Sequence, residues 1–429
     1  MEFIKHPPEV MADNRTRLVF EVIVEAGYKP GESLAQEAAL QQQFNGFAAE
    51  TMGVFLKSFD THGEPITVGK VIYTSKGTSP QEYQCYGGTI PLERHVYQSQ
   101  YGGRTYCPLE EYARIIENTT PYFASIVTGK YSAQSAGAVV TDMARSMQRK
   151  LTVSYIQDLT ESVGRAAQAK ERFLAYDINV PAQKVHAVLV SADAANVNIV
   201  GESYKNVCAG CFCLMDDEGE CLETIYLANS PEDGKVTFWQ RMDLETQRLK
   251  KLFPDVPWFG ISDGAADIQE WLHSQCDVVT LDFYHMSQYI NEAKEAFGKD
   301  LTSQKDWVQK ALHKLKHEEG SAAKLLTRMK SRSKSEELPP EILAPLVKAI
   351  GYLERNLERM EYALVHAEEM PIGSGVIEAS CKRVIKQRAC GSGMKWKRKG
   401  LQHVLSLRSL YLSSNRWEQF WKRCAHFGY

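Results

Sequence analysis

Short apolar runs and longer amphipathic stretches alternate between residues 184 and 282, and this order limits the possible folds more than any other feature of the chain. The apolar runs are short and bounded by turn-forming residues, so they predict buried strands. The predicted strands cover residues 185–192, 197–200, 207–215, 258–262 and 278–281, and the predicted helices cover 235–252 and 265–274. This succession predicts an α/β fold with a mixed sheet.

Residues 286–370 have a helical pattern that is rich in Lys, Glu, Leu and Ala, with one predicted break near 331–340. An all-helical stretch of this length does not belong to the sheet, so we interpret it as an insertion. Pro371 ends it, and Gly373-Ser374-Gly375 leads into a predicted helix over 376–388. A turn of this kind before a helix either holds a phosphate or is a plain turn.

The chain before the sheet contains a predicted polar helix over 33–58 and short strands with glycine-rich turns over 61–107. Two further helices are predicted over 133–148 and 155–173, with Ser154 as the N-cap of the second. Helix, short turn and helix is the geometry of a helix-turn-helix, but an ordinary helical hairpin has the same pattern, so DNA binding and a purely structural role both stay open.

The net charge of −3 conceals a strongly basic C-terminal region. Residues 371–429 contain twelve Lys or Arg and two acids, a net charge of +10, so the remaining 370 residues carry −13. A strongly basic segment in an otherwise acidic chain is typical of a protein that binds a polyanion, most often nucleic acid. A solvated basic face has the same composition. Trp396, between these cations, either stacks on an unpaired base or is a buried anchor.

Two aspartates end predicted strands, and a glutamate lies in the first turn of the helix after the insertion. These are Asp193, Asp263 and Glu378. Carboxylate oxygens are the ligands that Mg²⁺ and Mn²⁺ prefer, and open α/β sheets place their sites at the carboxyl ends of strands. Each residue also has a plain structural interpretation: a turn for Asp193, a helix N-cap or turn for Asp263, and helix-dipole complementation for Glu378.

The ten cysteines are scattered, which is typical of a reducing cytoplasm rather than of a disulfide framework. Cys208-x-x-Cys211-x-Cys213 has only Cys221 as a nearby fourth ligand, so buried strand cysteines are favoured over a zinc site. Strand alternation predicts Cys211 and Cys213 on one face and Cys208 on the other. No run of 18 apolar residues and no apolar signal core occur, so the sequence predicts no membrane segment.

Three stretches of the chain resemble one family of DNA-processing enzymes. They are residues 261–266 (ISDGAA), 281–285 (LDFYH) and 371–382 (PIGSGVIEASCK), the last continuing through 386–388 (KQR) to 391–396 (GSGMKW). With the order of strands and the helical insertion, they are similar to RNase H-like DDE transposases, above all the ISKra-type bacterial insertion-sequence transposases. Mutator-like and hAT elements are more distant relatives. Ala194 stands where the family usually has Gly, and 97–103 lacks the family's Cys-x-x-Cys.

The resemblance implies an α/β, RNase H-like core at 181–285 with a long all-helical insertion at 286–370, completed by 371–429. A helical DNA-binding region at 131–180 and an N-terminal domain at 1–130 precede it. It implies that Asp193, Asp263 and Glu378 form the catalytic triad and bind two Mg²⁺ or Mn²⁺ ions. Asp282 and His285 match the C/D-x-x-H signature of Mutator-like and hAT enzymes and would have an auxiliary role.

The partner implied by the resemblance is double-stranded DNA, both transposon ends and target, in the bacterial cytoplasm near the nucleoid. The expected DNA-contacting residues are Lys382, Arg383, Lys386, Arg388, Lys395, Trp396, Lys397 and Arg398. Pairing two ends takes at least two protomers, so a homodimer or larger assembly is expected. A structure-specific nuclease that cuts without joining, and a non-catalytic DNA-binding regulator descended from a transposase, are the alternatives.

Overall fold

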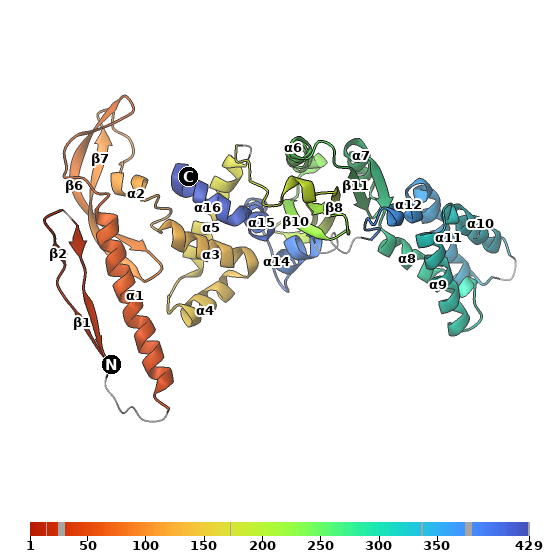
Figure 1. The fold of residues 1–429 in the computed structure, drawn as a ribbon, viewed down its shortest axis with the longest axis horizontal. Helices are drawn as coiled ribbons and strands as arrows, with labels where there is room; N and C mark the ends of the chain where they lie inside the picture. Colours follow the sequence, from red (N-terminus) through yellow and green to blue (C-terminus); the bar gives the residue numbers. More distant parts are fainter. Residues whose placement is uncertain (14, 25–30, 172, 336–337, 374–379, 428–429) are drawn as a thin grey trace. The chain divides into compact units, whose positions relative to one another are not determined.

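The computed structural model describes residues 1–13, 15–24, 31–171, 173–335, 338–373 and 380–427 (Figure 1). The chain forms two compact units, one made of Met1–Ala169 with Glu418–Tyr429 and the other of Lys170–Trp417. No helix in the described ranges combines the length and the apolar character needed to cross a membrane.

The first unit contains the predicted N-terminal helix and strands. Helix α1 (Ser33–Lys57) agrees with the prediction for 33–58. Residues 61–107 contain the antiparallel strands β5 (Ile66–Val68), β6 (Val71–Gln84) and β7 (Thr89–Ser99). Two strand pairs precede α1: β1 (Glu2–Lys5) with β4 (Phe20–Ile23), and β2 (Glu9–Val10) with β3 (Thr16–Arg17). The core joins α1 to the β6–β7 hairpin through Leu56, Tyr83 and Ile90.

The predicted helical hairpin of this unit is present, with shorter helices and a different cap. Besides α1, the described helices of this unit are α2 (Pro108–Tyr112), α3 (Pro121–Ala133), α4 (Ala136–Ser146), α5 (Val153–Lys170) and the part of α16 (Arg416–Phe427) from Glu418 onward. The assignment of Ser154 as N-cap is wrong, because α5 begins one residue before it. Thr152 is the N-cap instead, because its Oγ1 accepts a hydrogen bond from the Tyr155 N–H at 3.2 Å.

The second unit contains a five-stranded mixed sheet in the order β10-β9-β8-β11-β12. Its strands are β8 (Ala187–Ile199), β9 (Ser203–Met215), β10 (Cys221–Asn229), β11 (Trp258–Ser262) and β12 (Val278–Leu281). The first three are antiparallel, and β8, β11 and β12 are parallel. The prediction of a mixed α/β sheet is therefore confirmed.

Two strand predictions are wrong in detail. The predicted strands 185–192 and 197–200 are one continuous strand, β8, because the polar residues between them still pair with β9. Strand β10 has no counterpart among the predicted strands. It carries Glu223, which is buried beside a register shift, and this breaks the simple apolar pattern.

Helices cover both faces of the sheet (Figure 1). On one face Val188 and Val190 contact α6 (Val236–Leu252) and α7 (Ala266–Gln275), which lie close to their predicted positions. On the other face Leu189 and Val197 belong to a core shared with the helical region and with α15 (Arg398–Leu412). This two-residue alternation decides which strand side chains face which helices.

The region after the sheet is helical, as predicted, in the part that the structure describes. Its helices are α8 (Phe283–Glu292), α9 (Leu301–His317), α10 (Ser321–Ser333), α11 (Pro340–Asn356) and α12 (Tyr362–Ala367). The prediction of a single break is wrong, because the chain also turns between α8 and α9 and between α9 and α10. Asp300 forms a capping box at the first turn, and Gly320, at φ +65°, starts α10 after the second.

Candidate active site

Asp193 and Asp263 lie at equivalent positions of two neighbouring parallel strands. Ser191 of β8 pairs with Ile261 of β11, and each aspartate follows its paired residue by two positions. Neighbouring strands are about 4.8 Å apart. The two-residue period places both aspartates on the face of the sheet that carries Leu189 and Ile261. The charge of Asp263 acts on Asp193, so the two carboxyl groups are electrostatic neighbours.

Asp193 lies within β8, whereas the sequence placed it at the end of a strand. It is partly buried, and burial is the main reason that its pKa is raised. The negative charge of Asp263 raises the pKa further. The Ala194 N–H, which donates to Asp193 Oδ1 at 2.6 Å, acts in the opposite direction, as do the Cys381 thiol and Lys386. The site therefore holds a poorly solvated carboxyl group beside a second acid.

Asp263 begins the loop after β11 and is exposed. Its Oδ1 accepts a hydrogen bond from the Ala265 N–H at 3.2 Å, so the residue does form the turn that the plain interpretation expects. Its main-chain oxygen accepts a hydrogen bond from the Tyr352 phenol at 2.8 Å. The turn directs the chain toward α7, and the carboxylate stays accessible at the carboxyl end of the strand.

Asp282 and His285 form a pair beside these acids. Leu281 of β12 pairs with Ser262 of β11, so Asp282 and Asp263 each follow a paired residue by one position. Asp282 is buried and caps α8, because its Oδ1 accepts a hydrogen bond from the Tyr284 N–H at 2.9 Å. His285 Nε2 lies 3.7 Å from Asp282 Oδ2. Asp193, Asp263 and Asp282 are far apart along the chain. The register of the parallel strands places them at one level of the sheet.

Glu378 and the neighbouring Ser374 and Gly375 lie outside the described residues, so the third member of the predicted triad has no structural account. The described chain resumes at Ser380, two residues after Glu378. Cys381 follows, and its thiol donates a hydrogen bond to the Asp193 carboxylate. It opens η5 (Cys381–Lys386), a π-helical turn, a conformation that is frequent at functional sites. Sequence reasoning did not identify Cys381 as a residue of the site.

The two neighbouring aspartates fit a divalent cation. They offer hard oxygen donors, and a bound cation would offset both the burial of Asp193, which is the main cause of its raised pKa, and the repulsion by Asp263. Asp193 and Asp263 are the described residues that would hold such an ion. Within the described ranges, no set of three or more His, Cys, Asp or Glu side chains is arranged as a metal site.

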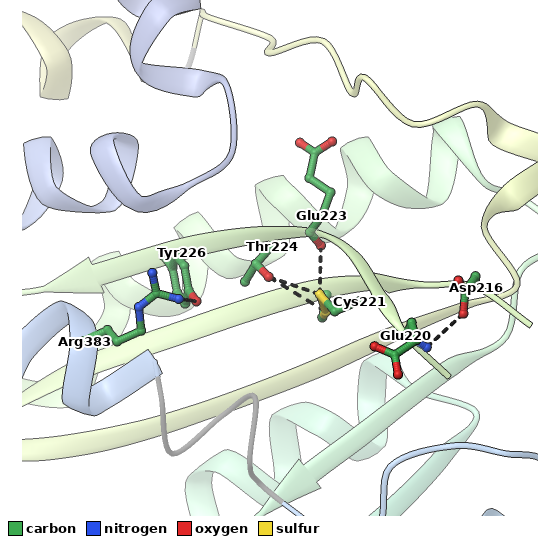
Figure 2. Close-up of a disulfide and its surroundings, with 8 residues drawn as sticks. Asp216, Glu220, Cys221, Glu223, Thr224, Tyr226 and Arg383 are labelled. Carbon is green, nitrogen blue, oxygen red and sulfur yellow. Dashed lines mark hydrogen bonds between the residues drawn. A yellow bond between two sulfur atoms is a disulfide. The ribbon is translucent and has the colours of Figure 1, made fainter. Parts of the chain in front are cut away.

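Five of the eight predicted DNA-contacting residues are exposed: Lys382, Arg383, Lys386, Lys395 and Lys397. Lys386 acts electrostatically on Asp193, which places this cation at the acids. Arg383 donates a hydrogen bond to the Tyr226 hydroxyl at 3.3 Å, and Figure 2 shows this contact. Of the exposed cations that η5 carries, Lys386 is therefore the one shown to lie near Asp193.

The other three predicted contact residues have partners within the chain. Arg388 is 2% exposed, and its guanidinium lies 4.9 Å from the centre of the Trp396 ring, so it cannot reach a phosphate. Trp396 is an anchor, because its indole N–H donates to the Ala389 oxygen at 3.1 Å and its main chain bridges to the end of β8. Arg398 holds Glu202 with two N–H groups and is already neutralised.

The cysteines of β9 are buried, as predicted, and their faces are also as predicted: Cys211 and Cys213 lie on one side and Cys208 on the other. One pair departs from the expectation of reduced thiols, because Cys213 and Cys221 form a disulfide (Figure 2). The β9–β10 hairpin brings their Cα atoms to 6.0 Å, a proximity that depends on the register of β10.

Replacing Asp193 with Asn is expected to stabilise the protein in the absence of divalent cations. A carboxyl group whose pKa is raised by folding opposes folding when it is charged. This loss of stability is absent below the pKa of Asp193 in the unfolded chain, about 3.9, where the group is protonated in both states. It is complete above the pKa of Asp193 in the folded chain. The free energy of unfolding of Asp193→Asn should therefore exceed that of the wild type near neutral pH, and the difference should shrink as the pH falls.

Urea denaturation in the presence of a chelator, repeated from about pH 8 to about pH 4, measures this difference. Asp255→Asn is the control, because Asp255 is exposed in a surface turn and should change stability at neither pH. If Asp193→Asn is less stable than the wild type near neutral pH, the charge of Asp193 is compensated in the folded chain and does not oppose folding.

No model of a known protein family matches the sequence, and no curated protein matches it significantly.

Proposed function

We propose that the chain is a metal-dependent DNA transposase with an RNase H-like core, interrupted by the helical region 286–370 as an insertion. The juxtaposition of Asp193 and Asp263 on adjacent parallel strands carries this proposal. The exposed cations of η5, which begin beside Asp193, and the long motif at 371–396 support it. A pair of acids beside a basic surface suits a negatively charged phosphodiester.

In this proposal Asp193, Asp263 and Glu378 hold two Mg²⁺ or Mn²⁺ ions. Bound in this way, the ions would supply the activation of a water or 3′-hydroxyl for in-line displacement at phosphorus. Lys382 and Lys386 would neutralise phosphates that flank the bond. Asp282 would orient His285 near the leaving oxygen, since the two side chains already face each other at 3.7 Å.

The partner of the protein in this function is double-stranded DNA. The α4–α5 hairpin would contact double-stranded DNA at the element ends, and Lys395 and Lys397 would contact it beyond η5. Two or more protomers would pair the two ends of an element, in the bacterial cytoplasm near the nucleoid.

The test is a cleavage assay with the full-length protein and a labelled duplex made from the DNA that flanks its reading frame. We expect nicks at a defined position and joined products when a target plasmid is added, both dependent on Mg²⁺ and both lost when EDTA removes it. Nicks without joined products would favour the structure-specific nuclease. DNA binding without nicks in Mg²⁺ or Mn²⁺ would contradict the enzyme and favour the regulator.

A further inference from the structure

The last turns of α11 contact the loop that carries Asp263. Tyr352 donates its phenol hydrogen to the Asp263 main-chain oxygen at 2.8 Å. Its ring is 8% exposed and stacks on Tyr289 of α8, with ring centres 3.9 Å apart and planes 11° from parallel. Two helices of the region after the sheet thus hold the phenol in one orientation toward the loop.

Asn356, one turn further along α11, supports the same loop. Its Nδ2 donates to the main-chain oxygen of Tyr352 at 2.8 Å, and its Oδ1 accepts from Gln269 Nε2 of α7 at 3.2 Å. Gly264, which has φ +101°, lies against this amide: a β-carbon there would be 3.3 Å from Asn356 Oδ1. The end of α11 therefore packs against this loop at Gly264.

The Asp263 side chain itself has few described contacts. Asp263 is exposed, and its carboxylate makes one described hydrogen bond, the 3.2 Å contact with the N–H of Ala265. A tyrosine phenol carries its proton at neutral pH, so Tyr352 can donate its hydrogen bond to the Asp263 main-chain oxygen.

We infer that Tyr352 is a positioning residue, which fixes the main chain of Asp263 so that its carboxylate stays beside Asp193. The inference rests on the proposed function for its catalytic consequence, but the positioning itself is a property of the fold. Metal sites depend on supporting hydrogen bonds of this kind, whose loss typically weakens metal binding about 10- to 100-fold. Residue 352 would couple the helical region to the acids.

The experiment compares Tyr352→Phe with Tyr289→Phe in the full-length protein. Each variant loses one hydroxyl from the same ring stack, but only the Tyr352 hydroxyl contacts Asp263 among the described residues. Hydrogen exchange of the amides of residues 263–265 is measured first. We expect exchange at least about threefold faster in Tyr352→Phe and unchanged in Tyr289→Phe.

The Mn²⁺ concentration that gives half-maximal DNA cleavage is measured next. It should rise at least about tenfold in Tyr352→Phe, with a smaller effect at saturating Mn²⁺, because the loss is in metal binding. Unchanged exchange in the loop, or equal changes in both variants, would overturn the inference. A different outcome separates the two proposals. If exchange is faster in Tyr352→Phe alone but the wild type neither binds Mn²⁺ nor cuts DNA, the positioning role is upheld and the proposed function is contradicted.

Discussion

Asp263→Asn is expected to lower the rate of DNA cleavage at least about a thousandfold, a loss of about 4 kcal/mol of transition-state stabilisation. Asn keeps the size of the side chain and can still accept the hydrogen bond from the Ala265 N–H, so the turn should persist. It removes a negative charge that a divalent cation needs. Binding of a labelled duplex should be unchanged, since Asp263 contributes no attraction to phosphate.

The control is again Asp255→Asn, which removes an exposed carboxylate from a surface turn of the same unit and should leave cleavage within about twofold of the wild type. Cleavage is measured in single turnover with enzyme in excess, so that product release does not mask the chemical step. Undiminished cleavage by Asp263→Asn would remove this residue from the mechanism, whereas a parallel loss of duplex binding would indicate a structural defect.

Glu245→Ala is expected to lower the free energy of unfolding of the second unit by about 3–5 kcal/mol. Arg416 Nη1 and Nη2 donate to the two carboxylate oxygens of Glu245 at 3.0 and 2.5 Å, and the two side chains are 6% and 5% exposed. The guanidinium also lies 5.1 Å from the centre of the Tyr176 ring. Removing the carboxylate leaves this guanidinium buried without its counter-charge, which costs more than the pair itself contributes.

Urea denaturation followed by tryptophan fluorescence reports mainly on the second unit, because six of the seven tryptophans belong to Lys170–Trp417. Glu292→Ala is the matched control. Glu292 pairs with Lys348 at 2.9 Å, but the two side chains are 49% and 59% exposed, so its loss should cost less than about 1 kcal/mol. Equal losses in the two variants would show that the Glu245–Arg416 pair does not behave as a buried one.

The elements of the second unit could largely be predicted from local pattern. Helices α6 and α7 and strands β11 and β12 lie close to their predicted ranges, because each has an uninterrupted apolar period. Five strands were predicted and the sheet has five, but only because two errors cancel: β8 was predicted as two strands, and β10 was not predicted. Both errors involve polar residues within a strand, whose pairing with neighbouring strands no local window reveals.

The candidate site was predictable in part. Asp193 and Asp263 were recognisable as acids associated with strands, and the structure brings them together. The basic residues were less predictable: Arg388 and Arg398 look like their neighbours in the sequence, yet one is buried against Trp396 and the other is paired with Glu202. A count of charges does not reveal which cations already have partners.

The local sequence was enough to identify most of the helices and strands and the two acids associated with β8 and β11, because these depend on hydrophobic period and turn chemistry within about ten residues. The shared level of Asp193, Asp263 and Asp282 in the sheet, and the hydrogen bond from Tyr352 to the Asp263 main chain, became visible with the three-dimensional fold. These contacts join residues 19 to 89 positions apart, as the register of parallel strands and the docking of α11 require. Such contacts arise from the pairing of whole elements, and no single segment encodes that pairing.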